Sequence, residues 1–578
     1  MKVLRKVVTC AVAMLIVSAG TVGSAPAAPA DSADRPGTTI RADLARQGAR
    51  IDDKYTDLTV WDYNGSWTTA ADSMPSDYYA KHYPEVKRVQ LMTATGGCYD
   101  GYPGCGSNRD LFKNPADRST TTDYDFAPLL HAVRNVVRQG LQPYVVTGNV
   151  PIKFTAQPAI SGSFGVNLRP PDDYKAYAAY IKALARAAIS EFGAAEVRSW
   201  KWGVLTEYEN GDWFKAADGT PQSTATAYFK LYDHTAKALT DAIGKGKVDI
   251  GAHSMTTQDG LWDERLFIDH VAKGRNHATG GIGAPIKFLS FSHYDDNPGE
   301  GPPPPHTFAS NLATLKDRAT AVGLHGIRFA VDEGRILRGS DDRELLPRSV
   351  AWSYQSALDA SRYATMVNDD VSWFARWDVN TEGYFGTGTE VDPVETNLAK
   401  LTSRLGGSRV LATTTAGLPA SEENQVGAVA GYDDKSDTLN VLVYNRSDDT
   451  SATTSERVTL DIANVTAAKH RPLSARQWRI DDEHANFWPT WNADMTARGM
   501  TSDSFDAPWS RDSWTVPRLV NEADRNYWYS RVPAYQKLAA LKAEPAGARI
   551  SGSKLVISAN LPPQGVALYQ ITGVRPGR

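Results

Sequence analysis

Two glutamates, Glu207 and Glu333, each follow a stretch that is typical of a buried strand. Glu207 comes after residues 197–205, which are rich in β-branched and aromatic side chains, and Glu333 comes after residues 327–331. Two carboxyl groups in one pocket can cleave a glycosidic bond, because a protonated acid assists the leaving oxygen while a carboxylate acts on the anomeric carbon. The alternatives are a capping or surface role for Glu207 and a turn role for Glu333 before Gly334.

Aromatic residues flank the first glutamate. Tyr208 and Trp213 follow Glu207 closely, and desolvation by such rings raises the pKa of a carboxyl group. Glu209 and Asp332 each neighbour a better-placed acid, so we expect their side chains to point elsewhere.

The two glutamates can share a pocket only if their strands end on the same face of one sheet. The chain alternates between strand-like and helix-like stretches, which predicts a parallel sheet. The predicted strands are residues 57–62, 88–95, 141–147, 197–205, 248–252, 286–291, 327–331 and 371–377. Eight such units predict an α/β fold with a (β/α)8 TIM barrel, whose catalytic side chains collect at the carboxyl ends of the strands. An open doubly wound sheet is the rival, but it would usually show a Gly-rich first turn, which the first strand lacks.

The chain changes character after about residue 404, where short alternating strands and turns predict a C-terminal β-sandwich. We expect a secretory signal peptide at residues 1–30, an N-terminal extension at 31–50, the catalytic barrel at 51–400 and the sandwich at 401–578. Residues 486–534 are expected to be irregular. Because no Gly/Ser-rich or Pro-rich tether joins the two domains, we expect the sandwich to pack on the barrel.

Composition restricts the partners of this protein. The formal charge of −4 is spread over 578 residues without basic clusters, which argues against nucleic acid held through its phosphates. The 15 Trp and 25 Tyr suit the C–H faces of sugars, although such rings also fill cores. No Gly-x-Ser-x-Gly or His-x-x-x-His motif supports a serine or metal hydrolase, and we expect neither a metal nor a cofactor.

The N-terminus carries a basic start, an apolar run at residues 7–17 and small residues at 25–30, which predicts export. The run is too short to span a bilayer, so we expect a secreted protein without a membrane anchor. Cys10 leaves with the signal peptide. The remaining cysteines, Cys98 and Cys105, lie seven residues apart, and we expect them to form a disulfide.

The order of these features resembles the clan A retaining glycoside hydrolases. Acids stand at the fourth and seventh strands, His293-Tyr294 follows the sixth, and Trp377 ends the eighth. Within the clan the chain most resembles family 39, the group of β-xylosidases and α-L-iduronidases. Residues 479–486, Arg-Ile-Asp-Asp-Glu-His-Ala-Asn, are similar to a stretch in the C-terminal region of that family.

The resemblance implies a role for each matching residue. Glu207 would be the acid/base and Glu333 the nucleophile, Tyr294 would hydrogen-bond the nucleophile, and Trp377 would form the floor of the sugar subsite. A carbohydrate substrate is implied. Further candidate substrate-binding residues are Thr206, Tyr208, His253, His293, Asn149 and Trp61. For His253 the alternative is a structural histidine.

The chain departs from the family pattern Asn-Glu-Pro, because it has Thr206-Glu207-Tyr208. The family asparagine binds the sugar 2-hydroxyl, a contact that strengthens in the transition state. This departure motivates a second hypothesis, a carbohydrate-binding barrel in which catalysis is weakened or lost.

Overall fold

The structure is a computed structural model. It describes residues 37–105, 109–162, 164–256, 260–295, 307–336, 352–377, 388–422, 424–449, 451–469, 471–506 and 516–577. The predicted signal peptide lies outside the described residues.

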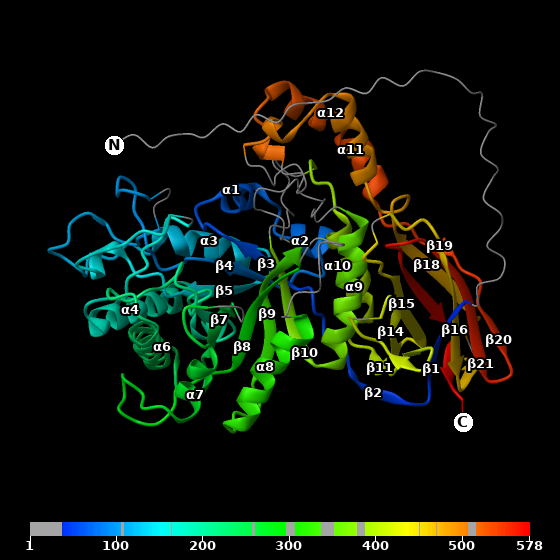
Figure 1. Cartoon of the computed structure of the whole chain (residues 1–578), viewed down its shortest axis with the longest axis horizontal. Coiled ribbons are helices and arrows are strands. Elements are labelled where there is room, and N and C mark those ends of the chain that lie inside the picture. The colour runs from blue at the N-terminus through cyan, green and yellow to red at the C-terminus, as the bar shows by residue number, and fades with distance from the viewer. Residues whose placement is uncertain are drawn as a thin grey trace, which may run out of the picture. The chain divides into compact units, whose positions relative to one another are not determined.

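Eight parallel strands close into a barrel (Figure 1). In chain order they are β3 (Asp57–Val60), β4 (Arg88–Leu91), β5 (Gln142–Thr147), β6 (Lys201–Val204), β7 (Asp249–Met255), β8 (Phe288–Asp295), β9 (Arg328–Ile336) and β10 (Val371–Arg376). The ring closes where β10 pairs with β3. Each strand corresponds to one of the eight stretches predicted from the sequence, so the barrel is confirmed and the open sheet is excluded.

Helices alternate with these strands and cover the outside of the barrel. They are α3 (Ala127–Arg138), α4 (Tyr174–Phe192), α6 (Pro221–Ile243), α7 (Arg265–Lys273), α8 (Phe308–Ala321), α9 (Ser353–Asn368) and α10 (Val394–Thr402), with short α1 (Ser66–Ser73), α2 (Tyr78–His82) and α5 (Ala194–Val197). The fourth strand is shorter than predicted. After α4 ends at Gly193, whose φ is +85°, the chain makes the extra turn α5, which buries Val197 before β6 begins.

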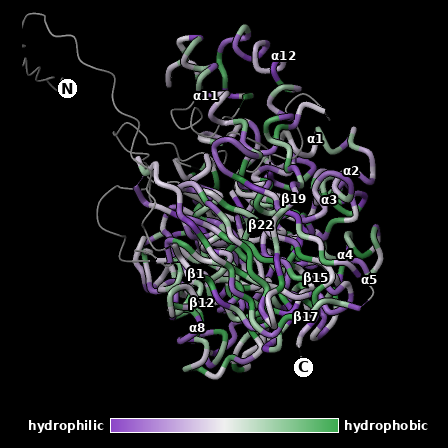
Figure 2. The backbone as a smooth tube through the Cα atoms, turned by 90° about the vertical axis from the view of Figure 1, so that its right-hand side faces the viewer, coloured by the Kyte–Doolittle hydropathy of each residue, from purple (hydrophilic) through white to green (hydrophobic). Residues whose placement is uncertain are grey.

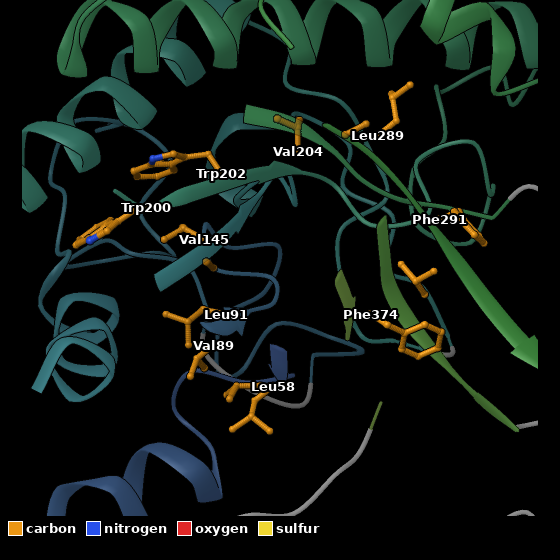
Figure 3. Close-up of a cluster of buried hydrophobic side chains, with 14 of the residues drawn as sticks. Leu58, Val89, Leu91, Val145, Trp200, Trp202, Val204, Leu289, Phe291 and Phe374 are labelled. Atoms are coloured by element: carbon orange, nitrogen blue, oxygen red, sulfur yellow. The ribbon is translucent and has the colours of Figure 1, made fainter. Parts of the chain in front are cut away.

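The side chains of each strand alternate between the helices and the barrel axis. Outward residues such as Val89, Trp202 and Leu289 join the large core under the helices (Figure 3). Inward apolar residues form a separate cluster inside the barrel. Its buried members are Met92, Tyr144, Val146, Phe288, Ala330 and Trp373.

Two sheets, in which most neighbouring strands are antiparallel, form the β-sandwich. One has the order β13-β12-β1-β16-β21-β20 and the other β19-β18-β22-β15-β14-β11-β2. The longer strands are β1 (Thr38–Asp43), β14 (Val426–Asp433), β15 (Thr438–Asn445), β16 (Glu456–Ala463), β18 (Ser474–Ile480), β21 (Lys554–Leu561) and β22 (Val566–Thr572). The shorter ones are β2 (Gln47–Arg50), β11 (Arg409–Leu411), β12 (Thr414–Thr415), β13 (Leu418–Pro419), β19 (Glu544–Pro545) and β20 (Arg549–Ser551). The hydrophobic residues run along the interior strands, such as β15 and β22 in Figure 2.

The N-terminal residues differ from the expected extension. Strand β1 (Thr38–Asp43) pairs in parallel with β16, and β2 (Gln47–Arg50) pairs with β11. Ile40 and Ala42 are buried in the core between the two sheets. These strands were not predicted, because partners that are distant in the sequence stabilise them rather than a local pattern of their own.

The barrel and the sandwich share part of one core. Val429, Leu442 and Leu568 of the sandwich belong to the same hydrophobic cluster as the barrel and its helices. Helix α9 contacts both β14 and β15.

The segment expected to be irregular contains two helices, α11 (Trp488–Ala497) and α12 (Glu522–Ala539). They build a small aromatic core, in which Trp491 and Trp528 lie with their ring centroids 5.0 Å apart. These helices were not predicted because neither has a marked amphipathic pattern. Contacts between aromatic rings, rather than one apolar stripe, stabilise them. None of the helices in the described part of the chain has both the length and the apolar character needed to cross a bilayer.

Candidate active site

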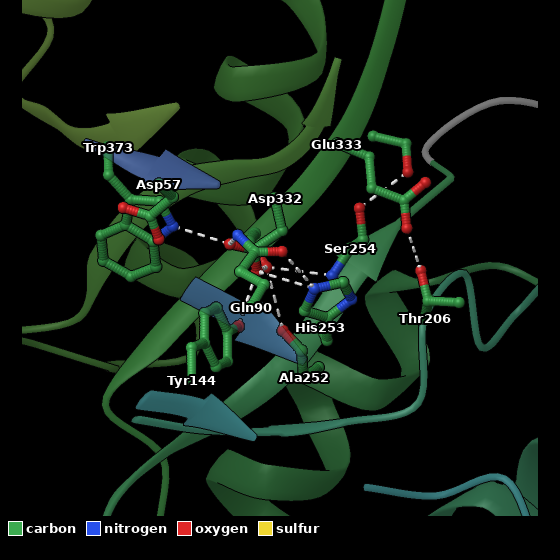
Figure 4. A network of polar contacts seen from close by, with 12 residues as sticks. Asp57, Gln90, Tyr144, Thr206, Ala252, His253, Ser254, Asp332, Glu333 and Trp373 are labelled. Carbon is green, nitrogen blue, oxygen red and sulfur yellow. Dashed lines mark hydrogen bonds and ion pairs between the residues drawn. The ribbon is translucent and has the colours of Figure 1, made fainter. Parts of the chain in front are cut away.

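Glu207 and Glu333 meet at the carboxyl ends of their strands. Glu333 belongs to β9, and Glu207 lies in the turn that follows β6. Thr206, the residue before Glu207, donates a hydrogen bond from Oγ1 to Oε1 of Glu333 at 2.5 Å (Figure 4). The fourth and seventh strands therefore direct their glutamates into one site.

The backbone that carries Glu207 is strained. Leu205 and Glu207 have φ angles of +58° and +41°, in the left-handed region that non-glycine residues rarely adopt. Gly148 makes room for this turn, since a Cβ there would lie 2.8 Å from Leu205. The Glu207 amide donates to the carbonyl of Ser254 at 2.6 Å. Strained backbone that the surrounding contacts hold in place is characteristic of functional sites.

Aromatic rings surround Glu207. The indole N–H of Trp213 donates to Glu207 Oε2 at 2.9 Å, and Phe164 stacks on Trp213 with centroids 3.9 Å apart. Trp61 contacts both Trp213 and Trp377 edge-on, at 5.4 and 6.0 Å. These four rings form an aromatic wall, which offers apolar faces of the kind that sugar C–H groups contact.

Hydrogen-bond donors surround Glu333. Tyr294 donates from its hydroxyl to Glu333 Oε2 at 3.0 Å, while Thr206 occupies Oε1. Glu333 is only 4% exposed. Donors on both oxygens favour the ionised carboxylate.

Burial raises the pKa of both glutamates. For Glu333 the charge of Glu207 raises the pKa further, against the hydrogen bonds from Thr206 and Tyr294. For Glu207 the hydrogen bonds from Ser292 and Trp213 oppose the effect of burial. Because each charge disfavours the other, the pair keeps a proton to higher pH than ordinary carboxyl groups do.

Tyr208 does not lie at the site of the two glutamates, contrary to the prediction. Its ring is buried outside the barrel, stacked on Tyr228 of α6 with centroids 4.1 Å apart and 3° between planes. The turn after β6 sends successive side chains to opposite sides, so Glu207 faces the site and Tyr208 faces the helices.

The two predicted histidines also lie away from the glutamates. His253 is fully buried inside the barrel, where its Nε2 lies 3.1 Å from Gln90 Oε1 and 3.9 Å from Asp332 Oδ2. His293 packs against Phe308 of α8, and burial lowers its pKa to about 3. On β8 its neighbours Ser292 and Tyr294 face inward, so alternation turns His293 outward.

Asn149 lies after β5 and is 2% exposed. Its amide nitrogen has no hydrogen-bond partner among the described residues. Its proposed contact with substrate therefore stays a prediction.

Phe164 belongs to the aromatic wall but was not predicted from the sequence. This residue lies in an irregular loop after β5, and no periodicity or motif marks it. Only its stacking on Trp213 brings it to the site.

Cys98 and Cys105 form a disulfide, as predicted. The bridge lies in the loop that follows β4. Asp110 anchors this loop, since its Oδ1 accepts hydrogen bonds from the amides of Gly97 and Cys98 at 2.7 and 3.1 Å.

One group of side chains has the composition of a metal site. Asp233, His270 and His277 bring potential ligand atoms within 4.8 Å of one another. The carboxylate of Asp233 already accepts hydrogen bonds from His270 Nε2, from the Asn276 amide and from the His277 backbone at 2.7 to 3.2 Å. These hydrogen bonds explain why Asp233 is buried, because they let its carboxylate anchor the loop after α7.

Known proteins resemble this chain in sequence. Residues 110–314 match the model of Glycosyl hydrolases family 39, a segment that contains Glu207 and Tyr294 and ends before Glu333. A β-xylosidase of Caldicellulosiruptor saccharolyticus is 31% identical over 155 residues, which cover 27% of this chain and 28% of that relative. The chain thus aligns with less than a third of the length of this curated relative.

Residues 110–314 of this chain are therefore similar to the glycoside hydrolases of family 39.

Solved structures share the fold of this chain. A monomeric β-xylosidase from Caulobacter crescentus CB15 superposes with a TM-score of 0.61 at 15% identity, over 92% of this chain and 99% of that chain. A bacterial orthologue of human α-L-iduronidase superposes with a TM-score of 0.60 at 15% identity, over 94% and 84% of the two chains. A family 39 enzyme from Xanthomonas axonopodis pv. citri gives 0.61 at 14% identity, over 94% and 99%.

Proposed function

We propose that this protein is a retaining, β-xylosidase-like hydrolase of O-glycosidic bonds in poly- or oligosaccharides. The observation that carries the proposal is the hydrogen bond from Thr206 to Glu333, because it joins the residue next to one glutamate to the carboxylate of the other. Two acids at one end of the barrel, the buried Glu333 and the half-buried Glu207, each with its own donors, supply the pair that glycoside hydrolysis needs.

The first step forms a glycosyl-enzyme. Glu333 attacks the anomeric carbon as a carboxylate and forms an ester bond while the glycosidic C–O bond breaks. Glu207 gives its proton to the departing oxygen, so the leaving group departs as an alcohol and Glu207 becomes a carboxylate.

The second step releases the sugar. The ionised Glu207 takes a proton from water, the water oxygen attacks the anomeric carbon, and Glu333 departs. Two inversions at one carbon retain the original configuration.

The surroundings suit these roles. Tyr294 and Thr206 hold both oxygens of Glu333, which fixes the carboxylate for attack. Trp213 holds Glu207 Oε2, and the aromatic wall offers a surface for the sugar.

We further propose that the protein is exported and that residues 1–30 are removed. The basic, apolar and small-residue segments of the N-terminus support this, as does the disulfide. The N-terminal sequence of protein recovered from the culture medium checks it, and recovery of the full-length chain only inside cells would contradict it.

A panel of aryl glycosides tests the activity, with xyloside, arabinoside, galactoside and iduronide included. We expect one of them to be cleaved, and proton NMR during the first turnovers to show product of retained configuration. Product of inverted configuration would refute the retaining mechanism. A soluble, folded protein that binds but never cleaves these sugars would favour the binding barrel.

A further inference from the structure

Asp332 and Glu333 are consecutive on β9, yet both point into the barrel (Figure 4). Regular strands place neighbours on opposite faces. The pairing with β8 explains the exception, because Val331 pairs with Phe291 and Glu333 with Ser292, which leaves Asp332 as an extra residue. The register with β10 shifts over the same residues. Strand β9 therefore has a β-bulge at Asp332, a feature that re-aims side chains next to active sites.

Four donors from four different strands hold the Asp332 carboxylate. Oδ1 accepts hydrogen bonds from Trp373 Nε1 at 2.6 Å and from Gln90 Nε2 at 3.2 Å. Oδ2 accepts from Tyr144 at 2.7 Å and from Ser290. The donors come from β4, β5, β8 and β10, so the carboxylate ties β9 to strands all around the barrel.

This arrangement needs a reason beyond the fold. A buried carboxylate is costly unless donors compensate it, and an apolar residue would fill a barrel interior more simply. The centre of the network, Asp332, is bonded through one peptide to Glu333.

We propose that Asp332 is a positioning residue for Glu333: its anchored side chain holds the β-bulge that turns the neighbouring carboxylate into the pocket. The inference rests on the proposed function, in which Glu333 must stand at attacking distance from the anomeric carbon. The identity of the sugar does not matter to it.

Asp332→Asn tests this role with an almost isosteric side chain. Asn presents an N–H₂ group to donors that need an acceptor, so the anchor loosens. We expect kcat to fall about 100-fold, the effect of misplacing a reacting group by about 1 Å. KM should change less than threefold, because Asp332 is fully buried and its carboxylate is occupied by donors inside the barrel.

The pH profile separates positioning from general damage. Among the described residues, the ionisable groups around Glu333 are Glu207 from the end of β6, Tyr294 from β8 and Asp332, with His253 of β7 beside Asp332. The charge of Asp332 raises the pKa of Glu333. Without that charge the pKa of Glu333 falls, and the acidic limb of kcat/KM should move to lower pH. A purely structural loss would lower the activity without moving the limb.

A second pair of variants guards against misfolding. Tyr144→Phe removes one donor from Asp332 and should lower kcat about tenfold. Tyr232→Phe is the matched control, since it removes a tyrosine hydroxyl whose 2.8 Å bond to the carbonyl of Pro285 lies outside the barrel. It should keep wild-type kcat.

The outcomes are distinct. Wild-type kcat and an unmoved acidic limb in folded Asp332→Asn would overturn the positioning role and leave the proposed function intact. Equal kcat losses in Tyr144→Phe and Tyr232→Phe would overturn it as well. An inactive wild-type enzyme would instead count against the proposed function.

Discussion

The hydroxyl of Thr206 lies 2.5 Å from Oε1 of Glu333, where the related family pattern has an asparagine amide at the position of Thr206. Thr206 is 1% exposed, so its single O–H is directed to the carboxylate rather than to solvent. The residue next to the proposed acid/base thus holds the proposed nucleophile.

Thr206→Val should shift the acidic limb of kcat/KM to higher pH. The hydrogen bond from Thr206 lowers the pKa of Glu333, so its loss raises that pKa, and the required carboxylate then forms only at higher pH. We expect kcat/KM to fall about 10- to 100-fold near neutral pH, the value of a hydrogen bond to a charged group. Thr206→Ser, which keeps the hydroxyl, should restore most of the activity; a profile that Val leaves unmoved would contradict the contact.

Glu207→Ala should harm substrates with poor leaving groups most, because these need the proton. General acid catalysis contributes about 10²- to 10⁴-fold, whereas a good aryl leaving group departs without it. Added azide should restore turnover and yield a glycosyl azide of retained configuration. Glu333→Ala is the comparison, since azide should not give a retained product there.

Trp213→Phe should move the basic limb of the profile to higher pH. The indole N–H stabilises the charged form of Glu207 and lowers its pKa, so its loss raises the pKa of the acid. We expect the acid to stay protonated to higher pH, with kcat about tenfold lower because a charge-assisted hydrogen bond is lost. Phe keeps an aromatic face against Phe164; an unchanged basic limb would argue that Trp213 only shapes the pocket.

Glu333→Gln should stabilise the fold at neutral and alkaline pH and abolish activity. Burial and the charge of Glu207 raise the folded-state pKa of Glu333 above its unfolded value near 4.5. Its contribution to stability is therefore fully present below about pH 4.5 and is lost as the pH rises through the folded pKa. We expect the variant to gain about 1 to 3 kcal/mol at pH 8 and nothing near pH 4. Melting temperatures of both proteins across this range provide the measurement, and an equal gain at both pH values would refute the electrostatic cause.

Replacing Cys98 and Cys105 together by Ser should cost about 2 to 3 kcal/mol, the loop-closure value for a bridge of this spacing. Denaturant unfolding measures the loss. Non-reducing mass spectrometry of the wild type should show no free thiol, and two free thiols would exclude the bridge.

The sequence by itself determined the elements and the position of the two glutamates in them. Alternation of strand and helix predicted all eight barrel strands, and parallel strands must end on one face, so acids after the fourth and seventh strands had to come together. Neighbouring cysteines in one loop predicted their bridge for a similarly local reason.

Tertiary structure alone decided where the other side chains point. The bulge at Asp332 breaks the alternation that assigned this acid to the opposite face, and it depends on how β9 registers with β8 and β10. Tyr208 and His293 lie one residue from groups that face the site, so a single step of the backbone sends them to the helices. Strand β1 forms because two strands that are distant in the sequence, β12 and β16, offer it partners. Local sequence patterns predict secondary structure because helices and strands repeat within a few residues. Strand register and β-bulges depend instead on contacts between strands that are distant in the sequence.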